Sequence, residues 1–113
     1  MYKDTQEVGS PTIGLDFDST VTTNPQMWAD IVKIFKTCGC KVYIVTYRDT
    51  VSWDNKDIYE FSGMCEIDQV IFTACKAKKP YCLNKGIIID IWIDDNPLAI
   101  VASLTPEGFV LEK

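Results

Sequence analysis

Histidine is absent from this chain of 113 residues. Without an imidazole the protein cannot contain a Ser-His-Asp triad, a histidine-ligated zinc ion or a histidine acid/base. Any catalysis must therefore use carboxylates, lysine, cysteine or a metal ion. The chain also lacks an apolar run approaching the roughly 18 residues that a membrane span requires, so no membrane partner is expected.

Positive charge is scarce as well: 11 Lys and Arg stand against 16 Asp and Glu, which gives a net charge of −5. An acidic protein repels long polyanions, so duplex nucleic acid is not an expected partner. The five cysteines are an odd number, and no signal peptide precedes them. Cys38 and Cys40 lack the two-residue spacer of zinc and redox motifs. We therefore predict reduced, mostly buried thiols in a cytoplasmic protein.

Apolar strand-like segments alternate with segments of helical periodicity. The expected strands are 12–17, 41–46, 69–72, 87–93 and 108–111, and the expected helices are 25–38, 54–64, 80–85 and 96–104. Such alternation indicates a parallel sheet covered by helices on both faces. We predict an α/β, three-layer Rossmann-like domain over residues 12–113, with a mainly parallel five-stranded sheet, after a flexible lead-in at 1–11. The sequence carries no signal for an oligomeric state.

Polar residues follow the predicted strands. Asp16 and Asp18 come after the first strand, Thr46 ends the second, and Asp94-Asp95 follow the fourth. Because the carboxyl ends of parallel strands meet at one edge, these side chains should converge there. Converging carboxylates require a cation. Oxygen ligands without Cys or His favour Mg²⁺, the expected cofactor.

A lysine and a threonine hydroxyl beside such a cluster would bind a phosphoryl group. A carboxylate in line with phosphorus can attack it, and a second carboxylate two residues away can transfer the protons. Taken singly, each motif has an ordinary interpretation: Asp-x-Asp as a solvated turn, Asp94-Asp95-Asn96-Pro97 as a cap, and the lysines as surface charge. Their order and their placement at strand ends favour a site.

Asp16-Phe17-Asp18-Ser19-Thr20 resembles the first motif, Asp-x-Asp-x-Thr, of the haloacid dehalogenase superfamily. The resemblance implies that Asp16 is the nucleophile and Asp18 the acid/base. It also implies that Mg²⁺ is bound by the Asp16 side chain, by the Asp18 backbone carbonyl and by Asp94-Asp95, which look like the fourth motif.

The remaining two motifs are phosphate-binding. Val42 to Thr46 looks like the second motif, which ends in a phosphate-binding Ser or Thr. The third motif supplies one lysine near the start of a helix. Lys78 is preferred from its spacing to Pro80, Lys79 is the next choice, and Lys76 also competes.

No cap domain fits between these motifs, because each interval is filled by one helix with its flanking strand and loops. The resemblance therefore implies a small capless phosphatase with an open site, acting on a small-molecule, nucleotide or macromolecular phosphoester and suited to bulky ones. An Asp at position 18 favours phosphomonoester hydrolysis. Arg48 is either a substrate contact or a surface arginine.

The same residues allow three rival interpretations. A non-catalytic member of the same fold would bind phosphate or a partner without turnover. A polynucleotide 3′-phosphatase remains open within the enzyme class, since a strand end needs less positive surface than a duplex. A phosphorylation-switch receiver domain has the opposite motif order, with the paired acids after the first strand.

Overall fold

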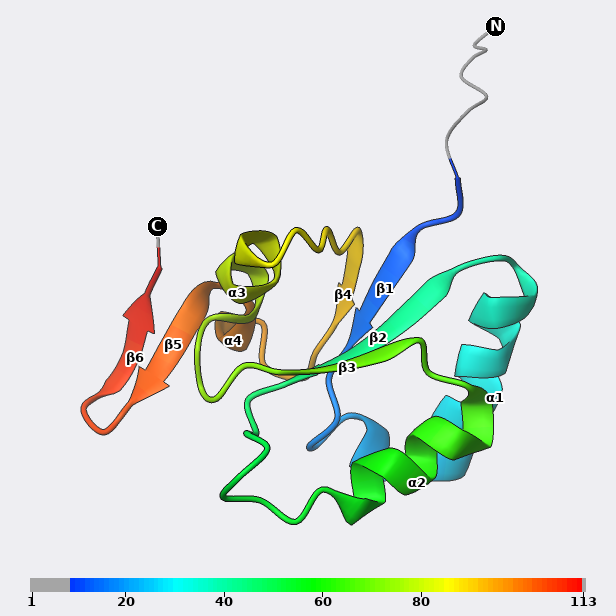
Figure 1. Ribbon diagram of the computed structural model, residues 1–113, viewed down its shortest axis with the longest axis horizontal. Coiled ribbons are helices and arrows are strands. Elements are labelled where there is room, and N and C mark those ends of the chain that lie inside the picture. The colour runs from blue at the N-terminus through cyan, green and yellow to red at the C-terminus, as the bar shows by residue number, and fades with distance from the viewer. Residues whose placement is uncertain (1–8, 113) are drawn as a thin grey trace, which may run out of the picture.

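The computed structural model describes residues 9–112. Its strands are β1 (Thr12–Leu15), β2 (Lys41–Thr46), β3 (Gln69–Phe72), β4 (Ile91–Ile93), β5 (Ala102–Thr105) and β6 (Gly108–Leu111), and its helices are η1 (Val21–Thr23), α1 (Pro25–Thr37), α2 (Lys56–Cys65), α3 (Lys78–Asn84) and α4 (Leu98–Val101) (Figure 1). Residues 1–8 of the predicted lead-in lie outside the described residues. Within its last part, the Ser10 hydroxyl donates to the Cys38 carbonyl at 2.8 Å.

Four strands form a parallel sheet in the order β3-β2-β1-β4. The prediction of five strands in this sheet is wrong. The expected fifth strand, β6, pairs antiparallel with β5, which begins inside the segment expected to be the last helix. The physical reason is the connection: Pro106 and Glu107 are the only residues between β5 and β6. A two-residue turn can join antiparallel strands, whereas parallel strands need a long crossover.

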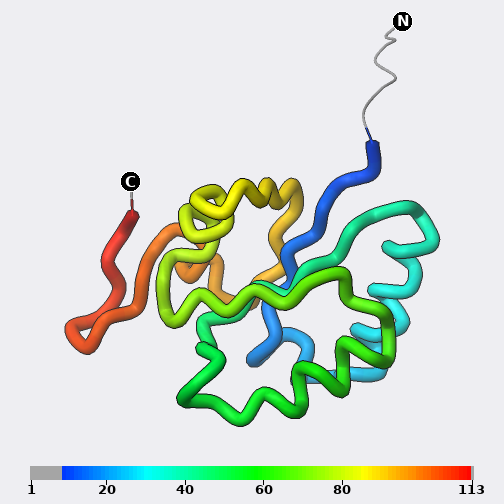
Figure 2. Tube along the Cα trace, in the orientation of Figure 1, coloured from blue at the N-terminus to red at the C-terminus, as the bar shows by residue number. Residues whose placement is uncertain are grey.

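Helices cover both faces of the sheet, which confirms an α/β layered architecture. α1 and α2 pack together on one face, and α3 and α4 lie on the other (Figures 1 and 2). Side chains of β2 alternate between the two faces: Val42 and Ile44 belong to the core under α1 and α2, while Val45 belongs to the core under α3. The sheet is therefore buried on both sides, as parallel sheets require.

Gly14 in the middle of β1 is required by packing. A Cβ atom at this position would lie 2.8 Å from Cγ2 of Ile89 and 3.0 Å from Cε3 of Trp92. The missing side chain lets the segment before β4 pack directly on β1. This brings β4 beside β1, the pairing on which the candidate site depends.

Helix α1 begins as the sequence predicts, since the Asn24 side chain accepts a hydrogen bond from the Met27 backbone N–H at 3.1 Å. Its buried face is centred on Ala29 and Val32, and Ile34 is 63% exposed. Within residues 9–112, no helix is long and apolar enough to cross a membrane. The five cysteines are free, and three of them are buried.

Candidate active site

The candidate site lies where the strand order of the sheet reverses. β1 has β2 on one side and β4 on the other, and the helices that follow β1 and β3 cover opposite faces. Such reversals leave a crevice at the carboxyl ends of the strands. Asp16 directly follows β1, and Asp94 directly follows β4. The Asp16 backbone N–H donates to the Ile93 carbonyl at 2.9 Å, which continues the β1–β4 pairing into the crevice.

A buried lysine joins the two strand ends. The Lys78 ammonium group donates to Asp16 Oδ1 at 2.7 Å and to Asp94 Oδ2 at 2.6 Å. Asp16, Asp94 and Asp95 each offer a carboxylate oxygen, and these oxygens lie within 4.8 Å of one another. We refer to Asp16, Asp94, Asp95 and Lys78 as the carboxylate cluster.

Thr20 fixes the orientation of two of these carboxylates. Its hydroxyl lies 3.0 Å from Asp16 Oδ2 and 3.3 Å from Asp95 Oδ1, and the same oxygen accepts the Asp95 backbone N–H at 3.2 Å. Thr20 reaches this position because the chain turns back after β1 through Ser19, whose φ is +64°. A left-handed non-glycine residue in such a turn is a form of local strain found at functional sites.

The charges within the carboxylate cluster do not balance one another. Its three carboxylates and one ammonium leave a formal charge of −2. Burial raises the pKa of Asp16 from 3.8 to about 6, and the attraction of Lys78 offsets this only in part. The single ammonium group therefore does not offset the burial of this carboxylate.

These residues fit a hard divalent cation. The donors are carboxylate oxygens from two adjacent strand ends, the donor type that Mg²⁺ prefers. A charge of +2 would also neutralise the cluster. The chemistry of the donor set therefore agrees with the predicted cofactor, with Asp16, Asp94 and Asp95 as the side chains able to hold it.

A cavity of about 180 Å³ opens directly on the carboxylate cluster, and Thr46 and Asp18 also line it. Thr46 is 1% exposed, and its hydroxyl oxygen accepts the Arg48 backbone N–H at 3.2 Å. The hydroxyl hydrogen has no acceptor among residues 9–112, so it is available to an oxygen atom placed in the cavity. The cavity has room for a small anion, and no inserted domain covers it within residues 9–112.

The structure distinguishes the three competing lysines. Lys78 is 2% exposed and points into the carboxylate cluster, whereas Lys76 and Lys79 are exposed. The loop before α3 delivers Lys78 through two consecutive left-handed residues, Ala74 at φ +53° and Cys75 at φ +66°. Lys78, the lysine preferred from its spacing to Pro80, is the one of the three that bonds the carboxylates of the cluster.

Asp18 is held apart from the carboxylate cluster. Arg48 donates from Nε to Asp18 Oδ2 at 3.0 Å and from Nη2 to Asp18 Oδ1 at 2.7 Å. The same guanidinium pairs with both oxygens of Asp57, at 2.8 and 2.9 Å. We refer to Asp18, Arg48 and Asp57 as the arginine fork. Arg48 is 5% exposed, so its interpretation as a surface arginine is wrong.

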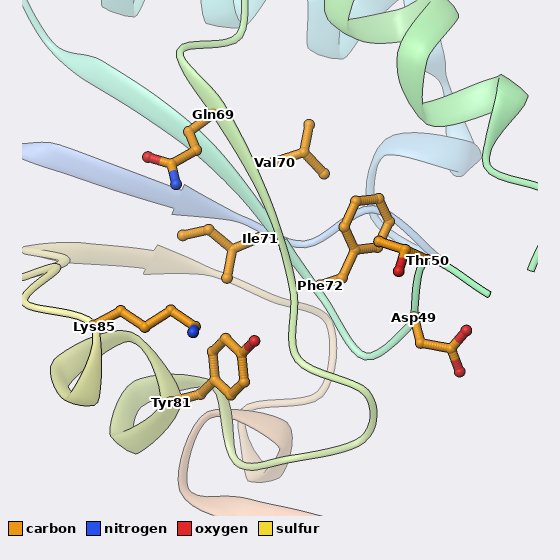
Figure 3. Close-up of a pocket in the computed structure, with 8 residues that line it drawn as sticks. All are labelled: Asp49, Thr50, Gln69, Val70, Ile71, Phe72, Tyr81 and Lys85. Carbon is orange, nitrogen blue, oxygen red and sulfur yellow. The ribbon is translucent and has the colours of Figure 1, made fainter. Parts of the chain in front are cut away.

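A second hollow lies along the free edge of β3, between Gln69 and Phe72 on the strand and Tyr81 and Lys85 at α3 (Figure 3). Asp49 is the only acidic residue that lines it. This hollow contains neither the carboxylate cluster nor Thr46. Its side chains provide no group of acids and donors comparable to those of the smaller cavity.

Several residues that the structure places at the site have no predicted role from the sequence. Thr20 belongs to the first motif, and in the structure its hydroxyl contacts the carboxylates of Asp16 and Asp95. The Tyr47 ring lies 5.5 Å below the Lys78 ammonium group, and its hydroxyl donates to the Ala102 carbonyl at 2.5 Å. Asp57 lies in the first turn of α2. In the sequence, Tyr47 could have been linked to the site only because it directly follows Thr46. No sequence pattern linked Asp57 to the site.

No protein-family model matches this chain, and no curated protein and no solved structure matches it either.

Proposed function

We propose that this protein is a magnesium-dependent phosphomonoester hydrolase that works through an aspartyl-phosphate intermediate on Asp16. The observation that carries the proposal is the position of Asp16. Its carboxylate lies at the topological switch point, 2.7 Å from the Lys78 ammonium group and beside two further carboxylates, on a cavity that Thr46 also lines.

The ligands of this cavity suit a phosphoryl group. Lys78 and the Thr46 hydroxyl would bind its oxygens, and Asp16, Asp94 and Asp95 would hold the cation. When bound, Mg²⁺ supplies positive charge that lowers the repulsion between the attacking carboxylate and the anionic phosphoester. Thr20 keeps the Asp16 carboxylate in one orientation, which favours in-line attack.

Two displacements at phosphorus make up the proposed reaction. In the first, an Asp16 oxygen forms a bond to phosphorus while the bond to the leaving oxygen breaks, and Asp18 gives that oxygen a proton. In the second, water attacks the aspartyl-phosphate, Asp18 takes up a water proton, and Asp16 and inorganic phosphate are released. Asp18 lines the cavity, which suits this role.

The substrate proposed is a bulky or macromolecular phosphoester or a nucleotide. The cavity of about 180 Å³ has room for the phosphoryl group and leaves the rest of a substrate outside. Selectivity must then come from the surrounding rim. A polynucleotide strand end remains one member of this class.

The test is hydrolysis of para-nitrophenyl phosphate with Mg²⁺, with EDTA, and by Asp16→Asn. Asp30→Asn is the matched control, because Asp30 is an exposed carboxylate on α1 whose side chain bonds Gln26, away from the carboxylate cluster. We expect activity with Mg²⁺, loss in EDTA and in Asp16→Asn, and no change in Asp30→Asn. A folded wild-type protein without turnover on para-nitrophenyl phosphate or on phosphorylated peptides and oligonucleotides would point to a non-catalytic binding protein instead.

A further inference from the structure

We infer that Arg48 is a positioning residue that acts through Asp18, rather than a ligand of the substrate; the catalytic part of this inference rests on the proposed function. Arg48 follows the second strand by two residues and lies at the same rim as the carboxylate cluster. An arginine in that place would ordinarily be a phosphate ligand, because its planar fork suits phosphate oxygens. Its hydrogen bonds lead to a different conclusion.

The donors of Arg48 are all in use. A guanidinium has five N–H groups. Nε bonds Asp18, and the two hydrogens of Nη2 are directed at Asp18 and Asp57. Nη1 bonds Asp57 and has the Asp54 carbonyl at 3.3 Å and the Asn55 side-chain oxygen at 3.4 Å. No N–H remains for a substrate oxygen unless one of these bonds breaks.

Two aromatic rings also contact the Arg48 guanidinium. The guanidinium carbon lies 5.2 Å from the centre of the Phe17 ring and 4.9 Å from the centre of the Trp53 ring. Cation–π contacts of this kind add to the restraint of the fork. Phe17 lies between Asp16 and Asp18 in the sequence, so the fork packs against the chain segment that carries both carboxylates.

Asp18 itself depends on this contact. Its side chain is 45% exposed and follows a strand end, so burial does not fix its orientation. Arg48 binds both of its oxygens, a geometry that defines the plane of the carboxylate. Asp57 at the start of α2 binds the adjacent edge of the guanidinium, through Nη1 and Nη2, and holds it in place. The chain of contacts thus runs from α2 through Arg48 to the proposed acid/base.

The test is a double-mutant cycle in activity on para-nitrophenyl phosphate, with Arg48→Lys and Asp18→Asn. Lysine keeps the charge but cannot bind two oxygens of one carboxylate in a fork. We expect Arg48→Lys alone to lower kcat by roughly 10- to 100-fold, the order expected for a catalytic group displaced by about 1 Å. We expect KM to be unchanged. In the Asp18→Asn background the same substitution should have less than about a twofold effect on kcat.

Two other roles predict other outcomes. A substrate ligand would raise KM in Arg48→Lys, and the effect would persist in Asp18→Asn. A purely structural arginine would lower kcat by the same factor in both backgrounds. Either result would overturn the inference. Asp57→Asn should give an intermediate loss of kcat, and Lys36→Gln, which breaks the remote Lys36–Asp68 ion pair, should give none.

A second cycle measures the contact without activity. The melting temperatures of Asp18→Ala, Arg48→Lys and the double variant should be non-additive, with the double variant losing less than the two single losses combined. Additive losses would overturn the contact whether or not the protein is an enzyme. A wild-type protein that shows this coupling but no phosphatase activity would refute the proposed function and the catalytic part of the inference, while leaving the contact in place.

Discussion

Two groups of carboxylates and cations lie at the same rim of the sheet, only two residues apart at Asp16 and Asp18, and they are built differently. In the arginine fork both oxygens of each carboxylate are bound by one guanidinium, and no donor is left over. In the carboxylate cluster one ammonium group bonds two of the three carboxylates, those of Asp16 and Asp94. The fork has a formal charge of −1 and a bonded partner for every carboxylate oxygen, whereas the cluster has a formal charge of −2 that a bound cation would balance.

The pKa values follow this difference. Hydrogen bonds from Arg48 lower the pKa of Asp57, while burial raises the pKa of Asp16 to about 6. The charged form of the Asp57 carboxylate is therefore stabilised, whereas the charged form of the Asp16 carboxylate is destabilised. Unsatisfied charge is expensive in a folded protein and is retained mainly where it serves binding or catalysis.

The largest effect should come from removing the single cation of the carboxylate cluster. Lys78→Met should lower kcat/KM by about 100- to 1,000-fold, the loss typical of one electrostatic donor at a reacting group. Lys79→Met is the matched control, since Lys79 is exposed, and its kcat/KM should equal that of the wild type. An equal loss in both variants would contradict the assignment of Lys78.

The next effect concerns the pH dependence of stability in metal-free buffer. Because the folded-state pKa of Asp16 is raised from 3.8 to about 6, the folded state binds more protons between these values. The free energy of unfolding should therefore fall as pH rises from about 4 to about 6, by up to about 3 kcal/mol. Asp16→Asn should lack this fall and be the more stable protein at pH 7. Urea unfolding of both proteins at several pH values measures this change in the free energy of unfolding.

Adding Mg²⁺ sharpens the same measurement. A divalent cation that binds the folded protein raises its stability by mass action. At pH 7, Mg²⁺ should raise the free energy of unfolding of the wild type measurably and that of Asp16→Asn only slightly. Equal stabilisation of both proteins by Mg²⁺ would show that the ion binds elsewhere.

Breaking the arginine fork should lower the free energy of unfolding by slightly less than the pH effect of Asp16. Arg48→Met leaves Asp18 and Asp57 unpaired, but their side chains are 45% and 50% exposed and can be hydrated. We expect a loss of roughly 2–3 kcal/mol in the free energy of unfolding, below the 3–5 kcal/mol typical of fully buried pairs. Lys36→Met removes an ion pair that is more exposed on its cationic side and should cost about 0–1 kcal/mol. Guanidinium chloride midpoints compare the two.

The smallest expected effect on stability comes from a substitution at Ala74, in the loop between β3 and α3. The Ala74 backbone N–H bonds the Arg48 carbonyl, and the loop leads on to Lys78. Ala74 has φ +53°, so Ala74→Gly should raise the free energy of unfolding by about 0.5–1 kcal/mol. Ala77→Gly is the control, because its φ of −50° suits alanine, and it should lower stability. If thermal unfolding shows Ala77→Gly to be more stable than Ala74→Gly, the backbone at Ala74 is not strained.

Several features were determined by the sequence alone. Strand and helix periodicity predicted the four parallel strands and the helices between them, because hydrophobic burial imposes that alternation. The polar residues after β1, β2 and β4 predicted a site at one rim, and Asp16, Asp94, Asp95 and Thr46 do line one cavity. These inferences succeed because the carboxyl ends of neighbouring parallel strands always share an edge.

Other features were decided only by tertiary structure. The last apolar segment became half of a β5–β6 hairpin, since the length of a turn, rather than strand propensity, selects the pairing partner. Arg48 met Asp57 because the start of α2 folds back to the rim. Contacts between residues distant in the sequence depend on packing geometry, which no local pattern encodes.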